Sequence, residues 1–345
     1  MRKSLFIISL VLILFLSLFL SSYANLSIYF LDVEQGDASI IISSTGEVAL
    51  IDSGPKRDLI FNHLRNLKVG HIDLIIVSHA HADHITGMDE IIAKYQPRAF
   101  VDPGIAHTSK TYERMIDALK EYNINYYEGT SRKINLGPMT FTILPPADPL
   151  ITNSELNNNS IVVRLDYNNF SCLYTGDIEK ERESDLYERA SNLLDVDILK
   201  VPHHGSRSSS TPLFIKAVSP HIGIISCGEG NSYGHPHTET LVLLENLGIQ
   251  IFRTDINGTI IIQTDGIKYS IQTEKDVPRA PPLSIKEPKQ DDLSVYKYAA
   301  SKKSKVFHYI DCVHAKKITP ENLVLFKTRE EAIASGRSPC KTCSS

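Results

Sequence analysis

Short apolar runs alternate with amphipathic stretches from about residue 26 to residue 273. Runs rich in Ile, Val and Leu predict strands, whereas apolar residues spaced three and four apart predict helices. Strands are expected at 27–32, 38–42, 48–52, 74–77, 161–163, 172–174, 196–199, 222–225 and 259–262, and helices at 59–67, 178–190, 212–218 and 238–247. This interleaving predicts one layered α/β body.

The first 24 residues have a different pattern. A charged start is followed by an apolar run from Leu5 to Leu20 and by the small residues around Ala24. This order is typical of a secretory signal peptide, so we expect residues 1–24 to be cleaved and the protein to be secreted or displayed on a bacterial surface. The run is shorter than the ~20 residues that span a bilayer, although an uncleaved N-terminal membrane anchor is the alternative. No later run is long enough to form a membrane channel.

The pattern changes again after residue 275. Residues 276–292 contain four prolines and seven charged residues, which predicts an extended linker over 276–300 between a body at 25–275 and a small unit at 301–345. The small unit has nine Lys or Arg against four Asp or Glu, in a chain whose net charge is −4. A basic tail on an acidic body favours contact with DNA or another anionic polymer, and a solvated lysine-rich surface is the alternative.

The most informative segment is His79-Ala80-His81-Ala82-Asp83-His84, directly after the apolar run 74–77. It brings three imidazoles and one carboxylate into six positions. These donors together suit zinc, manganese or iron, and a loop at the end of a buried strand is where a scaffold presents reactive groups. The segment therefore predicts a metal site.

Other polar clusters also follow apolar runs, and strands would present them at one rim. They are Asp52, Asp177, His203-His204-Gly205-Ser206 and Gly234-His235-Pro236-His237. Each alone is explained by a turn, a cap or a surface histidine pair. Their repeated placement predicts that they share one site with the histidine segment.

This set of motifs resembles the metallo-β-lactamase superfamily and, more narrowly, its ComEC-like competence branch. The narrower resemblance covers residues 26–272 and rests on the segments 30–38 (FLDVEQGDA), 158–160 (NNS), 175–177 (TGD), 203–206 (HHGS), 233–236 (YGHP) and 253–255 (RTD). It implies an αββα sandwich with a metal site between the upper edges of two sheets. The cofactor would be zinc or manganese, as one or two ions.

The resemblance also implies roles for single residues. The metal ligands would be His79 and His81 at a first ion, Asp83, His84 and His203 at a second ion, and Asp177 between them. Asp83, Asp177, His204 and His235 would act in catalysis, Asn159, Ser160, Ser206 and His235 would bind substrate, and Asp37 and Asp52 would support the loops.

One departure from the superfamily concerns the first ion. Its hydrolases usually carry a further histidine before the bridging aspartate, but His107 does not match that place, and the matching region reads Asn157-Asn158-Asn159-Ser160. An amide oxygen is a weaker ligand than imidazole, so the first ion would bind loosely or not at all. The departure argues against lactam hydrolysis.

A bound cation lowers the pKa of its water from ~15.7 to about 7 and neutralises charge that develops on an attacked phosphate. The sequence thus favours an exported metal-dependent phosphodiesterase, most simply a nuclease acting on extracellular DNA. The first alternative is a phosphodiesterase for small phosphodiesters or surface phosphocholine esters. The second is a non-catalytic protein that binds nucleic acid or a cell surface.

The small unit carries two ligand pairs of its own, His308 with Cys312 and Cys340 with Cys343. One imidazole and three thiolates form a closed tetrahedral set, which predicts a structural zinc ion that supplies folding energy. The unit resembles the metal-binding domain of Ada DNA-repair proteins, with His308 where that family has its first cysteine. The other two cysteines, Cys172 and Cys227, lie in apolar runs and are expected in the core.

Overall fold

The computed structural model describes residues 25–275, 283–284, 297–310, 312–318, 322–326, 328–340 and 343. The chain divides after residue 285 into two compact units. The expected signal peptide and most of the expected linker lie outside the described residues, so both stay predictions, as do the domain boundaries. In the described part of the chain, no helix is long and apolar enough to cross a membrane.

The larger unit contains two mixed sheets. The first has the order β16 (Leu283–Ser284), β15 (Lys268–Thr273), β14 (Ile260–Thr264), β1 (Leu26–Phe30), β2 (Ala38–Ser43), β3 (Val48–Ser53), β4 (Leu74–Ile76), β5 (Ala99–Asp102) and β6 (Tyr126–Glu128). The second has the order β13 (Gln250–Arg253), β12 (Ile222–Ile225), β11 (Ile198–Lys200), β10 (Phe170–Tyr174), β9 (Val162–Tyr167), β8 (Met139–Leu144) and β7 (Arg132–Leu136). In the second sheet β10 to β13 run parallel, so the loops that follow them leave from the same edge.

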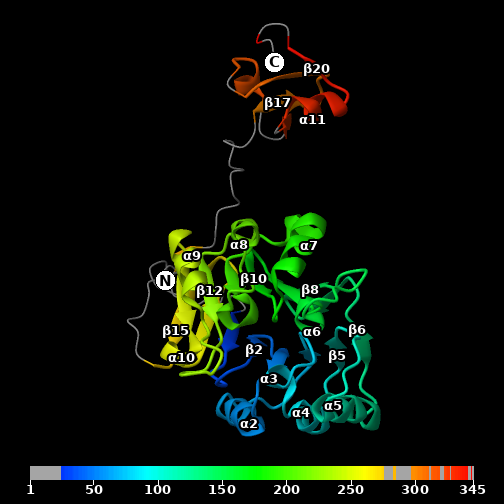
Figure 1. Cartoon of the computed structure of the whole chain (residues 1–345), viewed down its shortest axis with the longest axis vertical. Helices are drawn as coiled ribbons and strands as arrows, with labels where there is room; N and C mark the ends of the chain where they lie inside the picture. Colours follow the sequence, from blue (N-terminus) through cyan, green and yellow to red (C-terminus); the bar gives the residue numbers. More distant parts are fainter. Residues whose placement is uncertain are drawn as a thin grey trace, which may run out of the picture. The chain divides into compact units, whose positions relative to one another are not determined.

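Helices cover the outer faces of both sheets. Figure 1 shows α2 (Arg57–Asn66), α4 (Met88–Tyr95) and α5 (Lys110–Glu121) on one outer side, and α7 (Lys180–Ala190), α8 (Pro212–Val218) and α9 (Thr238–Asn246) on the opposite side. Three short helices, α3 (Ala82–Ile85), α6 (Glu155–Asn158) and α10 (Thr254–Asn257), lie in the loops. This is an αββα sandwich, so the expected fold class is confirmed.

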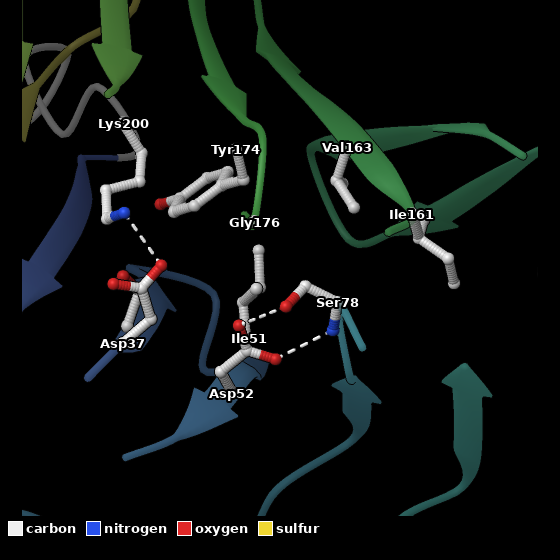
Figure 2. Close-up of a pocket in the computed structure, with 10 residues that line it drawn as sticks. Asp37, Ile51, Asp52, Ser78, Ile161, Val163, Tyr174, Gly176 and Lys200 are labelled. Atoms are coloured by element: carbon white, nitrogen blue, oxygen red, sulfur yellow. Dashed lines mark hydrogen bonds and ion pairs between the residues drawn. The ribbon is translucent and has the colours of Figure 1, made fainter. Parts of the chain in front are cut away.

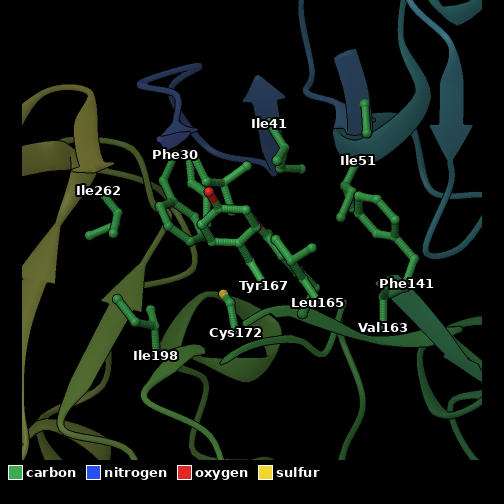
Figure 3. Packing of buried hydrophobic residues seen from close by; sticks show 14 of the residues in the cluster. Phe30, Ile41, Ile51, Phe141, Val163, Leu165, Tyr167, Cys172, Ile198 and Ile262 are labelled. Atoms are coloured by element: carbon green, nitrogen blue, oxygen red, sulfur yellow. The ribbon is translucent and has the colours of Figure 1, made fainter. Parts of the chain in front are cut away.

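The middle layer of the sandwich is the main hydrophobic core. Phe30 and Ile51 from the first sheet face Phe141, Leu165 and Cys172 from the second, and all five are at least 96 % buried (Figure 3). Burial of each large side chain stabilises the fold by about 1.5–3 kcal/mol. Because the layer is closely packed, it fixes the strand ends from which the polar loops depart.

In its described residues, the smaller unit forms a four-stranded sheet, one α-helix and a short 3₁₀ helix at Ala315–Lys317. The sheet has the order β19 (Leu323–Phe326), β17 (Tyr298–Ser301), β18 (Val306–Tyr309) and β20 (Ser338–Pro339), and α11 spans Arg329–Ala334. Thr328 caps α11 through a reciprocal pair of hydrogen bonds with Glu331. Among the residues of this unit that the structure describes, the buried cluster has five members, Tyr298, Ala300, Phe307, Phe326 and Ala332. So small a core needs a further source of stability, such as a metal ion.

Candidate metal centre

The histidine segment forms a loop and a short helix after β4. His79 and His84 are almost fully buried, and Asp83 and His84 belong to α3. His79 Nε2 lies 2.9 Å from His81 Nδ1. The imidazoles of His79 and His81 therefore converge on one point.

Asp177 reaches the same place from the second sheet. It follows β10 in a turn whose Gly176 has φ of 53°, and a Cβ at Gly176 would lie 2.8 Å from Ser78 Cβ. Only glycine allows the two loops to approach this closely. The approach places Asp177 Oδ2 3.4 Å from His84 Nε2 and 4.0 Å from His79 Nε2.

The adjacent residues His203 and His204, which follow β11, have different surroundings. Both have left-handed backbone, with φ of 49° at His203 and 53° at His204. His204 is buried, and its Nε2 lies 3.3 Å from both Asp83 Oδ2 and Asp177 Oδ2. His203 lies at the edge, with Nε2 3.8 Å from Asp177 Oδ2 and Nδ1 3.4 Å from Glu179 Oε1. The structure thus brings His204, and not His203, into the group of donor atoms around Asp83 and Asp177, and the choice of His203 as a metal ligand stays a prediction.

Four donor atoms, from Asp83, His84, Asp177 and His204, lie within 4.8 Å of one another. Inside this group His84 Nε2, His204 Nε2 and Asp177 Oδ1 are buried and have no hydrogen-bond partner. Burial of an unsatisfied polar atom costs about 1–3 kcal/mol. A metal ion bound by these atoms would remove that cost, so the residues fit the metal that the fold implies.

In each of the two histidines of this group, ring atom Nδ1 faces an aspartate that lies outside the group. His84 Nδ1 lies 2.9 Å from Asp52 Oδ2, and Ser78 donates to the same carboxylate from its backbone N and its Oγ, both at 2.7 Å. His204 Nδ1 lies 3.2 Å from Asp37 Oδ1 and 2.9 Å from the Ser226 carbonyl oxygen. Carboxylates in this position fix the tautomer and direction of a ligating imidazole.

A buried lysine, Lys200, pairs with the carboxylate oxygen of Asp37 that does not face His204 (Figure 2). Lys200 Nζ lies 2.7 Å from Asp37 Oδ2, beside a cavity of about 10 Å³ that Asp37, Asp52, Ser78 and Lys200 help to line. Burial alone would raise the pKa of Asp37, but the positive charges of Lys200 and His204 outweigh it and lower that pKa to about 2. The pKa of Asp52 is raised, because burial exceeds the opposing effect of His84.

An open cavity of about 240 Å³ leads to the metal ligands. It is lined by Gln35, His81, Ala82, Asp83, Asn157, Asp177, His203, His204, Tyr233 and His235. Tyr233 stacks on His235 at 5.6 Å between ring centroids, and His235 Nδ1 lies 3.5 Å from Gln35 Nε2. Burial and the neighbouring imidazoles lower the pKa of His235 to about 4, so its ring is neutral at pH 7.

Residues 31–229, more than half of the chain, match the family model of the metallo-beta-lactamase superfamily. The chain belongs to this superfamily. It is 31% identical over 252 residues to ComE operon protein 3 of Bacillus subtilis (67% of this chain, 32% of the relative) and 26% identical over 249 residues to Recombination protein 2 of Haemophilus influenzae (70% and 29%). The chain spans about a third of the length of these curated relatives. Among solved structures it is similar to the metallo-beta-lactamase fold protein YhfI of Bacillus subtilis, with a TM-score of 0.47, 13% identity and coverage of 70% of this chain and 100% of that one.

Three residues expected to bind substrate do not line the cavity of this metallo-β-lactamase fold. Asn159 is buried, its Oδ1 accepts from the Ile151 backbone N at 3.1 Å, and its Nδ2 donates to the Ile151 carbonyl at 2.8 Å. Ser160 is also fully buried, and Ser206 Oγ lies 3.0 Å from Ser208 Oγ. Asn159 and Ser206 bond within their loops, whereas the Oγ of Ser160 is buried without a hydrogen-bond partner. Their expected role in substrate binding stays a prediction.

The sequence interpretation assigned no role to Gln35, Lys200 or Tyr233, and it considered Asn157 only as one of the amides that stand in place of a histidine ligand. Two of them carried a signal. Lys200 is a charged residue within the buried strand β11, and such a residue requires a partner of opposite charge. Tyr233 lies two residues before His235 in the YGHP motif, and in the structure its side chain is 66% exposed.

A second group of metal-binding type lies in the smaller unit. Donor atoms of His308, Cys312 and Cys343 lie within 4.8 Å of one another, with Cys312 Sγ 3.8 Å from His308 Nδ1. Cys340 is outside this group, and its backbone N donates to the Phe307 carbonyl at 2.9 Å. Three of the four expected zinc ligands are therefore brought together.

Proposed function

We propose that this protein is an exported metal-dependent phosphodiesterase that cleaves DNA. The observation that carries the proposal is the group of Asp83, His84, Asp177 and His204, of which the last three are buried, at the base of an open cavity. A bound cation would satisfy the unpaired atoms of His84, Asp177 and His204, and the cavity would let a substrate reach that cation. Export rests on the predicted signal peptide alone.

The residues of the cavity suit a phosphodiester. A zinc or manganese ion held by the four donors would act as a Lewis acid and would supply a water of lowered pKa. His235 is neutral at pH 7 and half-buried beside the ligands, so it offers a hydrogen bond to a phosphate oxygen without a full positive charge. His203, whose ring centroid lies 5.5 Å from that of His235, presents a second imidazole on the same wall.

Two further observations support DNA as the substrate. The names of the relatives in Bacillus subtilis and Haemophilus influenzae refer to the ComE operon and to recombination. Residues 301–345 also carry more than twice as many Lys and Arg as Asp and Glu. Contacts between such cations and phosphates release counterions and give affinity that is independent of base sequence.

The test compares the purified protein with two histidine variants on linear and circular DNA, in the presence of manganese, zinc or EDTA. His204→Ala removes a donor of the metal group, whereas His71→Ala removes an exposed histidine outside it. Metal-dependent cleavage by the wild type and by His71→Ala, but not by His204→Ala, would support a nuclease. If the wild type cuts neither DNA with any metal, DNA is not the substrate.

A second candidate substrate is a small phosphodiester with a cationic group, such as a phosphocholine ester. A hollow of about 360 Å³ shares Gln35 with the metal cavity and is lined by the carboxylates of Asp32, Glu34, Glu229 and Asp255, with Lys275. Asp32, Glu34 and Asp255 already form ion pairs with Lys275, Lys56 and Arg253, so the excess negative charge is small. Its sign still favours a cation over a nucleic-acid backbone. The two substrates are distinguished by rates on long DNA and on a chromogenic diester, because only a DNase would gain from polymer length.

A further inference from the structure

Three consecutive asparagines at the end of α6 differ in what their side chains do. Asn158 Oδ1 accepts from the backbone N of Glu179 at 2.9 Å, and Asn158 Nδ2 donates to the Asn153 carbonyl at 2.9 Å. Asn159 is likewise bonded at both ends of its amide. These two side chains connect loops and have no free oxygen for a ligand.

Asn157 is different, although it is also 93 % buried. Its Nδ2 donates to Glu179 Oε1 at 3.4 Å, while its Oδ1 is buried and has no hydrogen-bond partner. Because a carboxylate accepts only from the NH₂ side of an amide, Glu179 fixes which end of Asn157 is the oxygen. Asn157 lines the same cavity as His81 and Asp177. The unpaired oxygen therefore belongs to the wall of the metal site.

The first ion position lacks a donor that an amide oxygen can supply. His79 and His81 bring two ring nitrogens to one point, and Asp177 brings a carboxylate to within 4.0 Å of His79 Nε2. The four-donor group of Asp83, His84, Asp177 and His204 includes neither of these two histidines. Two imidazoles and a shared carboxylate hold an ion less completely than four convergent donors, and carbonyl-type oxygens suit manganese better than zinc.

We propose that Asn157 Oδ1 faces the ion held by His79 and His81, completes its protein donors, and makes this position the weaker of two and selective for Mn²⁺. Glu179 is the positioning residue, because it holds the amide of Asn157. The inference rests on the metal-dependent character of the proposed function and is independent of whether DNA is the substrate.

The test measures Mn²⁺ binding by isothermal titration calorimetry on the full-length, metal-free protein, with MnCl₂ as the probe. The wild type should show a tight and a weak binding phase. Asn157→Ala should weaken the weak phase at least about tenfold, as loss of a metal-site partner typically does, and leave the tight phase unchanged. Asn157→Asp keeps an oxygen and should retain the weak phase. The matched control is Asn153→Ala, an exposed asparagine just before α6 that donates to Glu181.

Melting temperatures establish that each variant is folded, and electron paramagnetic resonance shows whether two bound Mn²⁺ ions are coupled. A weak phase lost in Asn157→Ala but kept in Asn157→Asp and Asn153→Ala supports the proposal. Loss in both Asn157 variants, loss in neither, or a single phase in the wild type would overturn it. None of these readouts uses a substrate, so failure of the DNase proposal leaves the result interpretable.

Discussion

Lys200 Nζ and Asp37 Oδ2 form an ion pair of 2.7 Å in which the two side chains are only 3% and 8% exposed. The pair lies directly behind the metal group, because Asp37 also faces His204 Nδ1 at 3.2 Å. A buried ion pair contributes little net stability, since both charges lose their hydration. Its place here is better explained by the need to hold Asp37 ionised and fixed against the imidazole of His204.

Lys200→Met tests whether Asp37 is buried and ionised. Removal of one partner leaves the carboxylate of Asp37 buried without its main counter-charge, and such losses typically cost about 3–5 kcal/mol. We expect the free energy of unfolding in urea to fall by that amount. The control Lys180→Met, at a lysine 67% exposed on the surface, should change it by less than about 0.5 kcal/mol. A loss below about 1 kcal/mol at Lys200 would contradict a buried, ionised pair.

Alanine substitutions at His203 and His204 should distinguish a residue that binds the metal from one that contacts the substrate. His204→Ala removes a donor of the four-membered group, so the protein should lose its tightly bound ion during dialysis. His203→Ala should keep that ion, because His203 lies outside the group, but should cleave more slowly. Metal content measured by mass spectrometry distinguishes them. Retention of the ion by His204→Ala and its loss from His203→Ala would support the assignment made from the sequence.

The fold could be predicted from the sequence because apolar runs and polar clusters carry the signal together. The expected strand at 38–42 corresponds to β2 and the expected helix at 212–218 to α8. The clusters around Asp83 and Asp177 meet as expected, because sandwich strands present their ends at a common edge. Shorter elements with less regular patterns, such as β6, whose three residues are all exposed, gave no such signal.

The finer parts of the site could not be predicted for a geometric reason. His203 and His204 are neighbours, and only their left-handed backbone, with φ near 50°, determines that the second imidazole turns inward. Residue spacing does not specify that turn. Similarly, nothing in the run Asn157-Asn158-Asn159 indicates which amide is left unpaired, because their partners come from residues up to 24 positions away.

The buried carboxyl group of Glu183 makes the free energy of unfolding depend on pH. It is fully buried on α7 and accepts hydrogen bonds from the backbone N of Ser210 and of Thr211. Burial outweighs these bonds and raises its pKa from 4.5 to about 7. The folded protein therefore binds more protons at this group than the unfolded chain between pH 4.5 and 7. The stability that Glu183 contributes is fully present below pH 4.5 and is lost as the pH rises through 7.

Glu183→Gln isolates this contribution, because the amide oxygen of Gln still accepts from both backbone groups but does not ionise. At about 1.4 kcal/mol per pKa unit, the wild type should lose up to about 3 kcal/mol more than the variant between pH 4.5 and pH 8. Urea unfolding at several pH values measures the difference. Parallel stability curves for the two proteins would show that the carboxylate is ionised throughout this range.

Metal removal should affect the smaller unit separately. The buried cluster of five described residues is too small to stabilise the sheet alone, whereas His308, Cys312 and Cys343 already present three donors for zinc. His308→Ala should therefore lower the zinc content by one ion per chain and make residues after 297 sensitive to limited proteolysis. His314→Ala is the matched control, because His314 is outside the donor group although its ring centroid lies 5.7 Å from that of His308. Zinc retained by His308→Ala, or lost equally from both variants, would show that His308, Cys312 and Cys343 do not stabilise this unit through a zinc ion.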